Sequence, residues 1–99
     1  MAYILSAQAE QDVRDVYDYG HSRFGDRQAM EYFDRLHSAF DRIDLTPMAS
    51  RLRAEFDPPI RVHTFQAHVI LYAIQDADVY IYRVFHGAAD WHSVFSAEG

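Results

Sequence analysis

The sequence predicts one small α+β domain in the order β-α-α-β-β-β, with a helical hairpin packed on an antiparallel sheet. Three observations lead to this prediction. The first half of the chain repeats its apolar residues at helical spacing, the second half holds three runs of β-branched and aromatic residues, and the connections are short. Because 99 residues suffice for one hydrophobic core, we expect residues 1–99 to form a single domain.

A short strand and a helix open the predicted order. Residues 3–5 are apolar, and Ser6 is placed to accept hydrogen bonds from the free N–H groups of the helix that follows. Apolar and small residues then recur at three- and four-residue steps, which marks one face of a helix. These residues are Ala9, Val13, Val16, Tyr17 and Gly20. The acidic residues Asp12, Asp15 and Asp18 are expected on the opposite side.

The second helix has the most regular pattern in the chain. Its apolar residues are spaced by 4, 3, 4 and 3, which forms a stripe along one face. They are Ala29, Phe33, Leu36, Phe40 and Ile43. Gly25 is suited to end the first helix in a left-handed conformation, Asp26 can cap the second, and Thr46-Pro47 ends it. Because the link is so short, the helices must run antiparallel.

The second half of the chain predicts a β-meander. After a loop at residues 47–59, strands are expected at residues 60–66, 68–75 and 79–86. Short turns at Gln66-Ala67 and Asp76-Ala77-Asp78 make neighbouring strands antiparallel. Alternation along the last strand predicts two faces. One holds Val79, Ile81, Arg83 and Phe85, and the other holds Tyr80, Tyr82, Val84 and His86.

The ends of the meander complete the prediction. The first strand is expected to join one edge of the sheet, and the helical hairpin to cover one face. The other face then stays partly open, which favours a partner there. Residues 87–99 are expected to be a tail, with residues 92–99 at its end and Trp91 and Phe95 as anchors.

Composition excludes several classes of protein. The chain has no cysteine, so it has neither disulfides nor thiolate chemistry. Its formal net charge of -6 argues against non-specific nucleic-acid binding. All nine cations are arginine, a residue suited to bidentate contacts with carboxylate or phosphate groups. We see neither a signal peptide nor an apolar run long enough to span a membrane, so we expect a cytoplasmic protein.

No standard catalytic or nucleotide-binding signature is present. Three histidines on the predicted strands, His63, His68 and His86, are candidates for metal ligands. Their spacing is unspecific and no acidic residue repeats with them, so we expect no metal site.

Arginines and histidines on the predicted sheet form a second candidate constellation. Its members are Arg61, Arg83, His63, His86 and Tyr82, with Glu55 as a further candidate. Such groups can cleave a phosphodiester, with one base, one acid and an arginine that stabilises the phosphorane charge. The structural alternative pairs the arginines with acids such as Asp78 or Asp90 and leaves the histidines on the sheet surface. The pattern alone favours this alternative.

Several local patterns recur in a recognisable order along the chain. In the first half they are Leu5-Ser6, Ala9, Asp12-Val13, Tyr19, Phe24-Gly25, Ala29, Tyr32, Leu36, Phe40, Ile43 and Pro47. In the second half they are Arg51, Glu55, Pro59-Ile60-Arg61, His68-Val69-Ile70-Leu71-Tyr72, Ile81-Tyr82-Arg83-Val84-Phe85-His86-Gly87 and Asp90. From residue 3 to about residue 91, this ordered set resembles the ParE branch of the ParE/RelE toxin superfamily of type II toxin–antitoxin systems.

The resemblance implies a growth-inhibiting toxin that a ParD-like antitoxin neutralises in a hetero-oligomer, a heterotetramer being one form. It implies that the toxin poisons DNA gyrase by direct binding, without catalysis, a cofactor, a membrane or sequence-specific nucleic acid. The antitoxin's C-terminal segment is expected to fold over the helical hairpin and the sheet. The implied antitoxin-binding residues are Tyr17, Phe24, Tyr32, Arg61, Tyr72 and Arg83, and the implied target-binding residues are His86, Asp90 and Trp91.

Two alternatives remain open at the level of sequence. RelE-type relatives cut messenger RNA on the ribosome, and in that case Arg61, Arg83, Tyr82 and His86 would be the catalytic residues. An acidic chain without lysine departs from that basic, lysine-rich branch. The other alternative is a non-toxic member that only binds an antitoxin.

Overall fold

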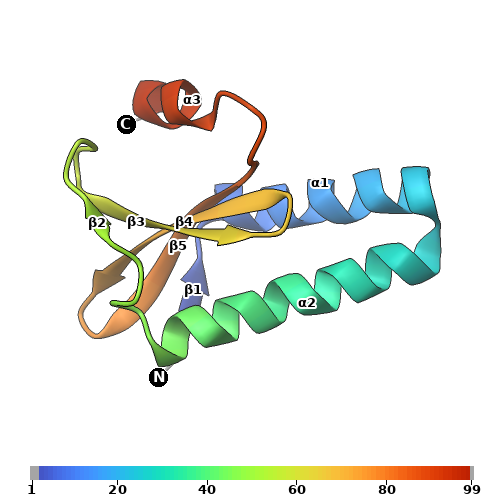
Figure 1. Ribbon diagram of the computed structural model, residues 1–99, viewed down its shortest axis with the longest axis horizontal. Coiled ribbons are helices and arrows are strands. Elements are labelled where there is room, and N and C mark those ends of the chain that lie inside the picture. Colours follow the sequence, from blue (N-terminus) through green and yellow to red (C-terminus); the bar gives the residue numbers. More distant parts are fainter. Residues whose placement is uncertain (1–2, 99) are drawn as a thin grey trace.

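Five strands form one sheet in the order β1-β5-β4-β3-β2, and two long helices pack on one of its faces (Figure 1). This computed structural model describes residues 3–98. The elements are β1 (Tyr3–Leu5), α1 (Ala7–Phe24), α2 (Asp26–Leu45), β2 (Leu52–Arg53), β3 (Ile60–Phe65), β4 (His68–Gln75), β5 (Asp78–His86) and α3 (Trp91–Glu98). Met1, Ala2 and Gly99, at the ends of the expected domain and tail, lie outside the described residues.

The helical hairpin is confirmed. Ser6 caps α1 as predicted, since its Oγ accepts a hydrogen bond from the backbone N–H of Ala9 at 2.9 Å. Gly25 alone joins the helices, with φ 90° and an extended ψ of 171°, so it has a positive φ but not the left-handed helical conformation. Asp26 is the first residue of α2 and does not cap it. Its carboxylate instead accepts a hydrogen bond from the Tyr17 hydroxyl at 2.9 Å.

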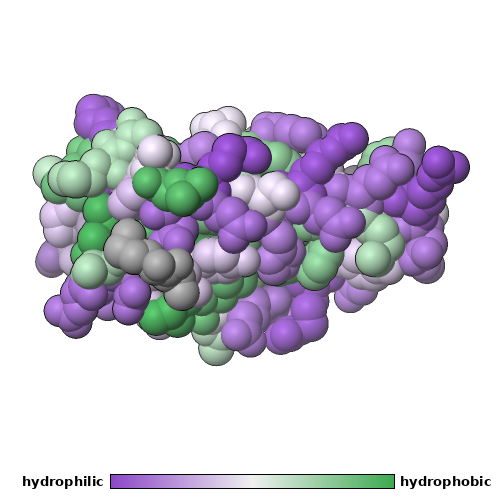
Figure 2. Space-filling view, turned by 90° about the horizontal axis from the view of Figure 1, so that it is seen from below, coloured by the Kyte–Doolittle hydropathy of each residue, from purple (hydrophilic) through white to green (hydrophobic). Residues whose placement is uncertain are grey.

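The main hydrophobic core lies between this hairpin and the sheet. Its fully buried members come from both helices and from the three long strands, as the two apolar stripes predict. They include Ala9, Val13, Leu36, Phe40, Ile43, Ile70, Tyr72, Val79 and Ile81. Seen from below in Figure 2, the hairpin end of the molecule is mostly hydrophilic, and hydrophobic residues gather toward the opposite end. The outer side of α2 is thus its polar side, as an amphipathic helix requires.

The antiparallel meander of β3, β4 and β5 is also confirmed. The turn between β4 and β5 has φ of 51° at Asp76 and 70° at Ala77, the positive values that favoured two-residue hairpin turns adopt. The first strand joins the edge as expected. Because β1 pairs with β5 in parallel, the whole sheet is mixed.

One irregularity in β5 corrects the predicted faces of that strand. Leu71 pairs with Arg83 and Tyr72 with Ile81, so Tyr82 is an extra residue without a partner in β4. This bulge shifts the alternation by one position. Val84 therefore joins the core under the helices. Phe85, which strict alternation places with Ile81, packs on the opposite side of the sheet.

The face that was expected to stay partly open is covered by α3 and by Phe56 of the loop before β3. The expected loop 47–59 also contains the short strand β2, which pairs with β3 and extends the edge of the sheet. The expected tail contains α3, which lies on the other side of the sheet from α2 in Figure 1. Trp91 and Phe95 do anchor it, against a small core that includes Phe56 and Ile60. Within residues 3–98, no helix has the length and apolar character needed to cross a bilayer.

Candidate functional site

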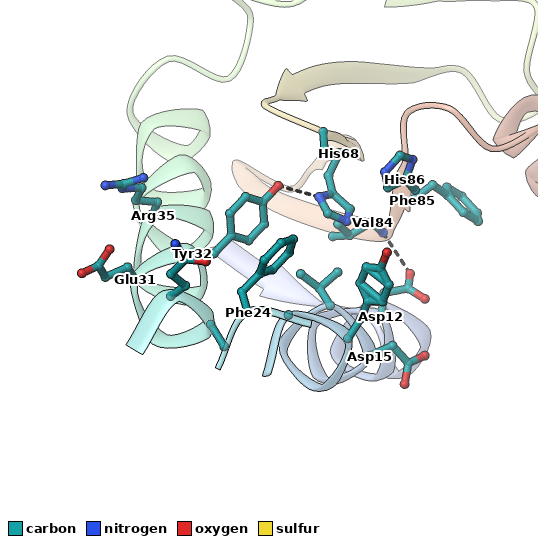
Figure 3. A pocket seen from close by; sticks show the side chains of 16 residues that line it. Asp12, Asp15, Phe24, Glu31, Tyr32, Arg35, His68, Val84, Phe85 and His86 are labelled. Atoms are coloured by element: carbon teal, nitrogen blue, oxygen red, sulfur yellow. Dashed lines mark hydrogen bonds between the residues drawn. The ribbon is translucent and has the colours of Figure 1, made fainter. Parts of the chain in front are cut away.

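A groove of about 690 Å³ opens between the helical hairpin and the adjoining ends of β4 and β5 (Figure 3). Both helices line it on one side, and the turn before β4 and the end of β5 line it on the other. The lining residues are Asp12, Asp15, Val16, Tyr19, Gly20, Phe24, Gln28, Ala29, Glu31, Tyr32, Arg35, Ala67, His68, Val84, Phe85 and His86. We call this cavity the hairpin groove.

Small residues where the helices meet form the base of the hairpin groove. A Cβ atom added to Gly20 would lie 3.7 Å from the Cα and Cβ atoms of Ala29, so the two helices approach closely here. Large aromatic side chains stand around this base. Phe24 is 61% exposed and Tyr19 is 56% exposed. Figure 3 shows Phe24 pointing into the cavity, so its apolar ring faces solvent within a concave site.

A tyrosine and two histidines form one wall of the hairpin groove. The Tyr32 hydroxyl lies 2.6 Å from Nδ1 of His68, a hydrogen bond that links α2 to β4. His68 pairs across the sheet with His86, and their rings lie 5.3 Å apart, edge to face. Burial lowers the pKa of His68, and the nearby His86 lowers it further. His68 is therefore uncharged at neutral pH.

Charged side chains occupy the rims of the hairpin groove. Asp15 lies on α1, whereas Glu31 and Arg35 lie on α2 (Figure 3). Asp15 accepts a hydrogen bond from the Gln11 side-chain amide at 2.9 Å. Glu31 lies 3.7 Å from the guanidinium of Arg27, in a pair that is largely exposed to solvent.

Asp12 lies deeper in the hairpin groove than these rim residues, and its carboxylate bonds to residues of β5. It accepts hydrogen bonds from Nε and Nη2 of Arg83 at 2.7 and 2.9 Å, and a third from the Val84 backbone N–H at 2.9 Å. Because β1 pairs only with residues 79–81 of β5, the N–H of Val84 lies on an otherwise free strand edge. This contact corrects the expectation that Asp12 faces solvent. Its hydrogen bonds raise the pKa of Arg83.

The implied antitoxin-binding residues do not form one cluster. Phe24 and Tyr32 both line the hairpin groove. Tyr17 does not line it, and packs its ring edge-on against Phe33 at 5.9 Å. Tyr72 is 1% exposed and its hydroxyl donates to the Pro47 carbonyl at 2.7 Å. The structure thus contradicts a surface role for Tyr72, because this large side chain is needed to fill the core.

Both arginines that the resemblance implies in antitoxin binding make polar contacts within the chain. Nη1 of Arg61 donates to the Ser50 carbonyl at 2.5 Å, which holds the segment before β2. Arg83 bonds to Asp12 and also forms an ion pair with Glu98 of α3. Arg83 is therefore not free to clamp a partner's carboxylate in this arrangement, whereas Arg61 keeps its charge and further N–H donors beside this one hydrogen bond.

The implied target-binding residues have different local surroundings. His86 lines the hairpin groove. Asp90 lies directly before α3, and its carboxylate accepts from the Ser93 backbone N–H at 3.4 Å. The Trp91 ring stacks on Phe56 with a centroid distance of 6.1 Å and so belongs to the core beneath α3.

The residues of the nuclease alternative also have separate partners. Arg61 and Arg83 lie on β3 and β5, two strands apart, at roughly 10 Å across the sheet. The Tyr82 hydroxyl accepts from the Gln75 side-chain amide at 2.8 Å, and Nδ1 of His86 accepts from the Ala88 N–H. Between Tyr3 and Glu98 no three His, Cys, Asp or Glu side chains come close enough together to hold a metal ion.

The residue types alone did not indicate Asp12 or the wall formed by Tyr32 and His68. The base of the hairpin groove had a signal, because Val16, Gly20 and Ala29 all belong to the predicted helix stripes. The small size of Gly20 and Ala29 is what lets the helices approach and leaves room above them.

Comparison with known proteins gives consistent matches to one family. A family model described as "ParE toxin of type II toxin-antitoxin system, parDE" matches residues 3–91. "Toxin ParE1" of Mycobacterium tuberculosis (strain ATCC 25618 / H37Rv) is 28% identical over 89 residues, which cover 89% of this chain and 91% of that protein. Toxin ParE1 of strain CDC 1551 / Oshkosh matches equally.

A solved structure from the "Chromosomal ParDE TA system from P. aeruginosa" has a similar fold. It superposes with a TM-score of 0.76 and covers 87% of this chain and 95% of its own. Because the identity is only 15%, this match shows similarity of fold alone.

Proposed function

This chain belongs to the family of ParE toxins of type II toxin–antitoxin systems, and on that premise we propose that a ParD-like antitoxin neutralises it by binding in the hairpin groove. The free protein then inhibits DNA gyrase by direct contact in the cytoplasm, without a cofactor. With its antitoxin it forms a hetero-oligomer.

One observation carries the antitoxin part of the proposal. Two large aromatic side chains, Phe24 and Tyr19, remain more than half exposed while lining a concave site with a small-residue base. Contiguous exposed apolar surface of this kind marks interaction sites. An amphipathic helix or an extended segment can bury its apolar side chains in such a groove.

The contacts that Arg61 and Arg83 make within the chain support inhibition by binding. Cleavage of RNA needs cationic groups that are available to stabilise the charge on phosphate. Arg83 is neutralised by Asp12 and Glu98, and Arg61, which keeps its charge, is held by the Ser50 carbonyl. Together with the net charge of -6, this favours contact with a protein target over catalysis on a nucleic acid.

The test combines growth and biochemistry. Expression of this chain alone should arrest growth, and co-expression with the product of the adjacent reading frame should restore it. Purified protein added to gyrase and plasmid should increase cleaved gyrase–DNA complexes, whereas the purified toxin–antitoxin complex should not.

Two results would contradict this proposal in different ways. Unchanged supercoiling and cleavage-complex levels would remove gyrase as the target. Codon-positioned cuts in translated messages, detected by primer extension, would restore the nuclease alternative.

A further inference from the structure

Two titratable side chains lie next to each other in the wall of the hairpin groove. His68 of β4 and His86 of β5 are direct partners across the sheet, and their ring centroids are 5.3 Å apart. Both line the hairpin groove, with His68 half-buried and His86 exposed. Histidine changes charge close to neutral pH, and two imidazolium ions at this separation repel each other. The charge of this wall therefore depends on pH.

The hydrogen bonds of the two imidazoles favour an uncharged wall. Nδ1 of His86 accepts from the Ala88 backbone N–H at 3.1 Å, which requires a free lone pair on that nitrogen. An imidazolium ion has a hydrogen on both ring nitrogens, so protonation of His86 breaks this contact. Nδ1 of His68 lies 2.6 Å from the Tyr32 hydroxyl. Burial raises the pKa of Tyr32, so this hydroxyl supplies no negative charge to a protonated His68.

The groups that face the histidine pair from α1 do not offer it a free negative charge. Asp12 is bonded to Arg83. Tyr19 presents its ring, with the guanidinium carbon of Arg23 lying 5.5 Å from the ring centroid. Figure 3 shows the Asp15 carboxylate directed away from the histidines. A proton on the pair therefore has no carboxylate partner on this helix.

The other elements around the pair do not compensate a positive charge either. On α2, the side chains of Glu31 and Arg35 point away from the histidines in Figure 3. On β3, the residue opposite His68 is the apolar Phe65. Asp90, between β5 and α3, accepts a hydrogen bond from a backbone N–H of α3. In these surroundings, burial and the neighbouring imidazole lower the pKa of His68.

We propose that pH controls occupancy of the hairpin groove through His68 and His86, so that the antitoxin binds when both imidazoles are uncharged and leaves when they take up protons. This inference rests on the proposed function and names the regulation of the same site. An occupant of the groove removes water from both side chains, and a covered charge without a partner is costly. Binding and protonation therefore compete, and acid favours the free toxin.

The first test measures affinity at two pH values. The purified antitoxin encoded by the adjacent reading frame is titrated into the full-length protein at pH 7.5 and 5.5. Wild-type affinity should fall about tenfold at the lower pH, the loss expected when one imidazole of ordinary pKa must be uncharged in the complex. The double variant His68→Gln/His86→Gln cannot titrate in the groove, so its affinity should change by no more than about twofold.

The second test counts protons directly. Calorimetry at about pH 6.5, in two buffers with different ionisation enthalpies, gives the number of protons released on binding. The wild type should release about half a proton more than the double variant, since an ordinary imidazole is half protonated at this pH. His21→Gln removes an exposed histidine of α1 outside the groove lining and should behave as the wild type does in both tests.

Two results would overturn this inference while leaving the proposed function intact. One is an equal response to pH and equal proton release in the wild type and the double variant. The other is tighter wild-type binding at pH 5.5, which would mean that the occupant places a carboxylate against the histidines. If the antitoxin does not bind even at pH 7.5, the proposed function fails, and this inference fails with it.

Discussion

Asp12 of α1 and Arg83 of β5 are joined by two hydrogen bonds of 2.7 and 2.9 Å across 71 residues of sequence. Their side chains are only 10% and 13% exposed. Asp12 also accepts the N–H of Val84, so one carboxylate closes the free edge of β5 and fixes the first helix against it. The pair thereby positions α1, which carries one side of the hairpin groove.

Arg83→Ala should therefore destabilise the domain, and not only weaken the antitoxin binding in which the resemblance implies that Arg83 takes part. The variant leaves the carboxylate of Asp12 poorly compensated, at a cost of about 3 kcal/mol in the free energy of unfolding. Urea denaturation measures this cost, with Asp18→Ala as an exposed control. If Arg83→Ala has the urea midpoint of the wild type but binds the antitoxin more weakly, Arg83 acts in recognition and not in stability.

Ser6→Ala should lower the free energy of unfolding by about 1 kcal/mol or somewhat more. The Ser6 hydroxyl oxygen accepts from the Ala9 N–H and its hydrogen is donated to the Tyr82 carbonyl at 2.7 Å, so the variant loses a helix cap and an edge contact together. Thermal melting with Ser38→Ala as the exposed control checks this. Equal melting temperatures would show that the cap is dispensable.

Stability should fall as the pH drops below the ordinary histidine value of 6.5. Burial lowers the pKa of both His63 and His68 in the folded state, with Arg42 and His86 as secondary causes. In that pH range the unfolded chain takes up protons that the folded chain resists, so acid favours unfolding until the lowered pKa values are reached. Urea midpoints measured between about pH 7.5 and 5, a range that brackets the ordinary histidine pKa of about 6.5, give the slope of stability with pH.

His68→Gln provides the control for this pH dependence, since glutamine cannot titrate. Its stability should be flatter with pH than that of the wild type, with the remaining slope due to His63 and to the carboxylates. A slope identical to the wild type would mean that His68 does not contribute.

Removal of the aromatic cluster beneath α3 should reveal how firmly this helix is held. Phe56 is 4% exposed and contacts Trp91, His92 and Phe95, so Phe56→Ala should cost about 3 kcal/mol or more. Trp91→Ala should cost less, because Trp91 is only partly buried. Hydrogen exchange should then show α3 opening before the sheet. Uniform destabilisation of all elements would indicate that α3 is an integral part of the fold.

Most of the fold could be predicted from the sequence because helical stripes and β-rich runs report burial directly. Strict alternation failed in β5, since the bulge at Tyr82 moves Val84 to the helix-facing side, and no periodicity argument detects one extra residue. The burial of Asp12 depends on the neighbouring edge of β5, which only the tertiary arrangement creates.

The sequence does contain a pattern that predicts the helix α3. Asp90 precedes the helix as a capping residue, and Trp91 and Phe95 are four residues apart on one face. For the candidate site, Phe24 and Tyr32 were identified by resemblance, and both line the hairpin groove. Tyr72 could not be separated from them by residue type, because a tyrosine suits a core as well as an interface.

The central claim, that the antitoxin binds in the hairpin groove, is tested most directly by titrating the purified antitoxin into two charge variants. Phe24→Asp changes an exposed groove residue, whereas Leu45→Asp changes an equally apolar residue that is 79% exposed at the far end of α2. Phe24→Asp should weaken binding by about thirtyfold, as expected for a residue at the centre of an interface, and Leu45→Asp should not change it. Equal affinities for Phe24→Asp and the wild type, or a loss confined to Leu45→Asp, would contradict the account.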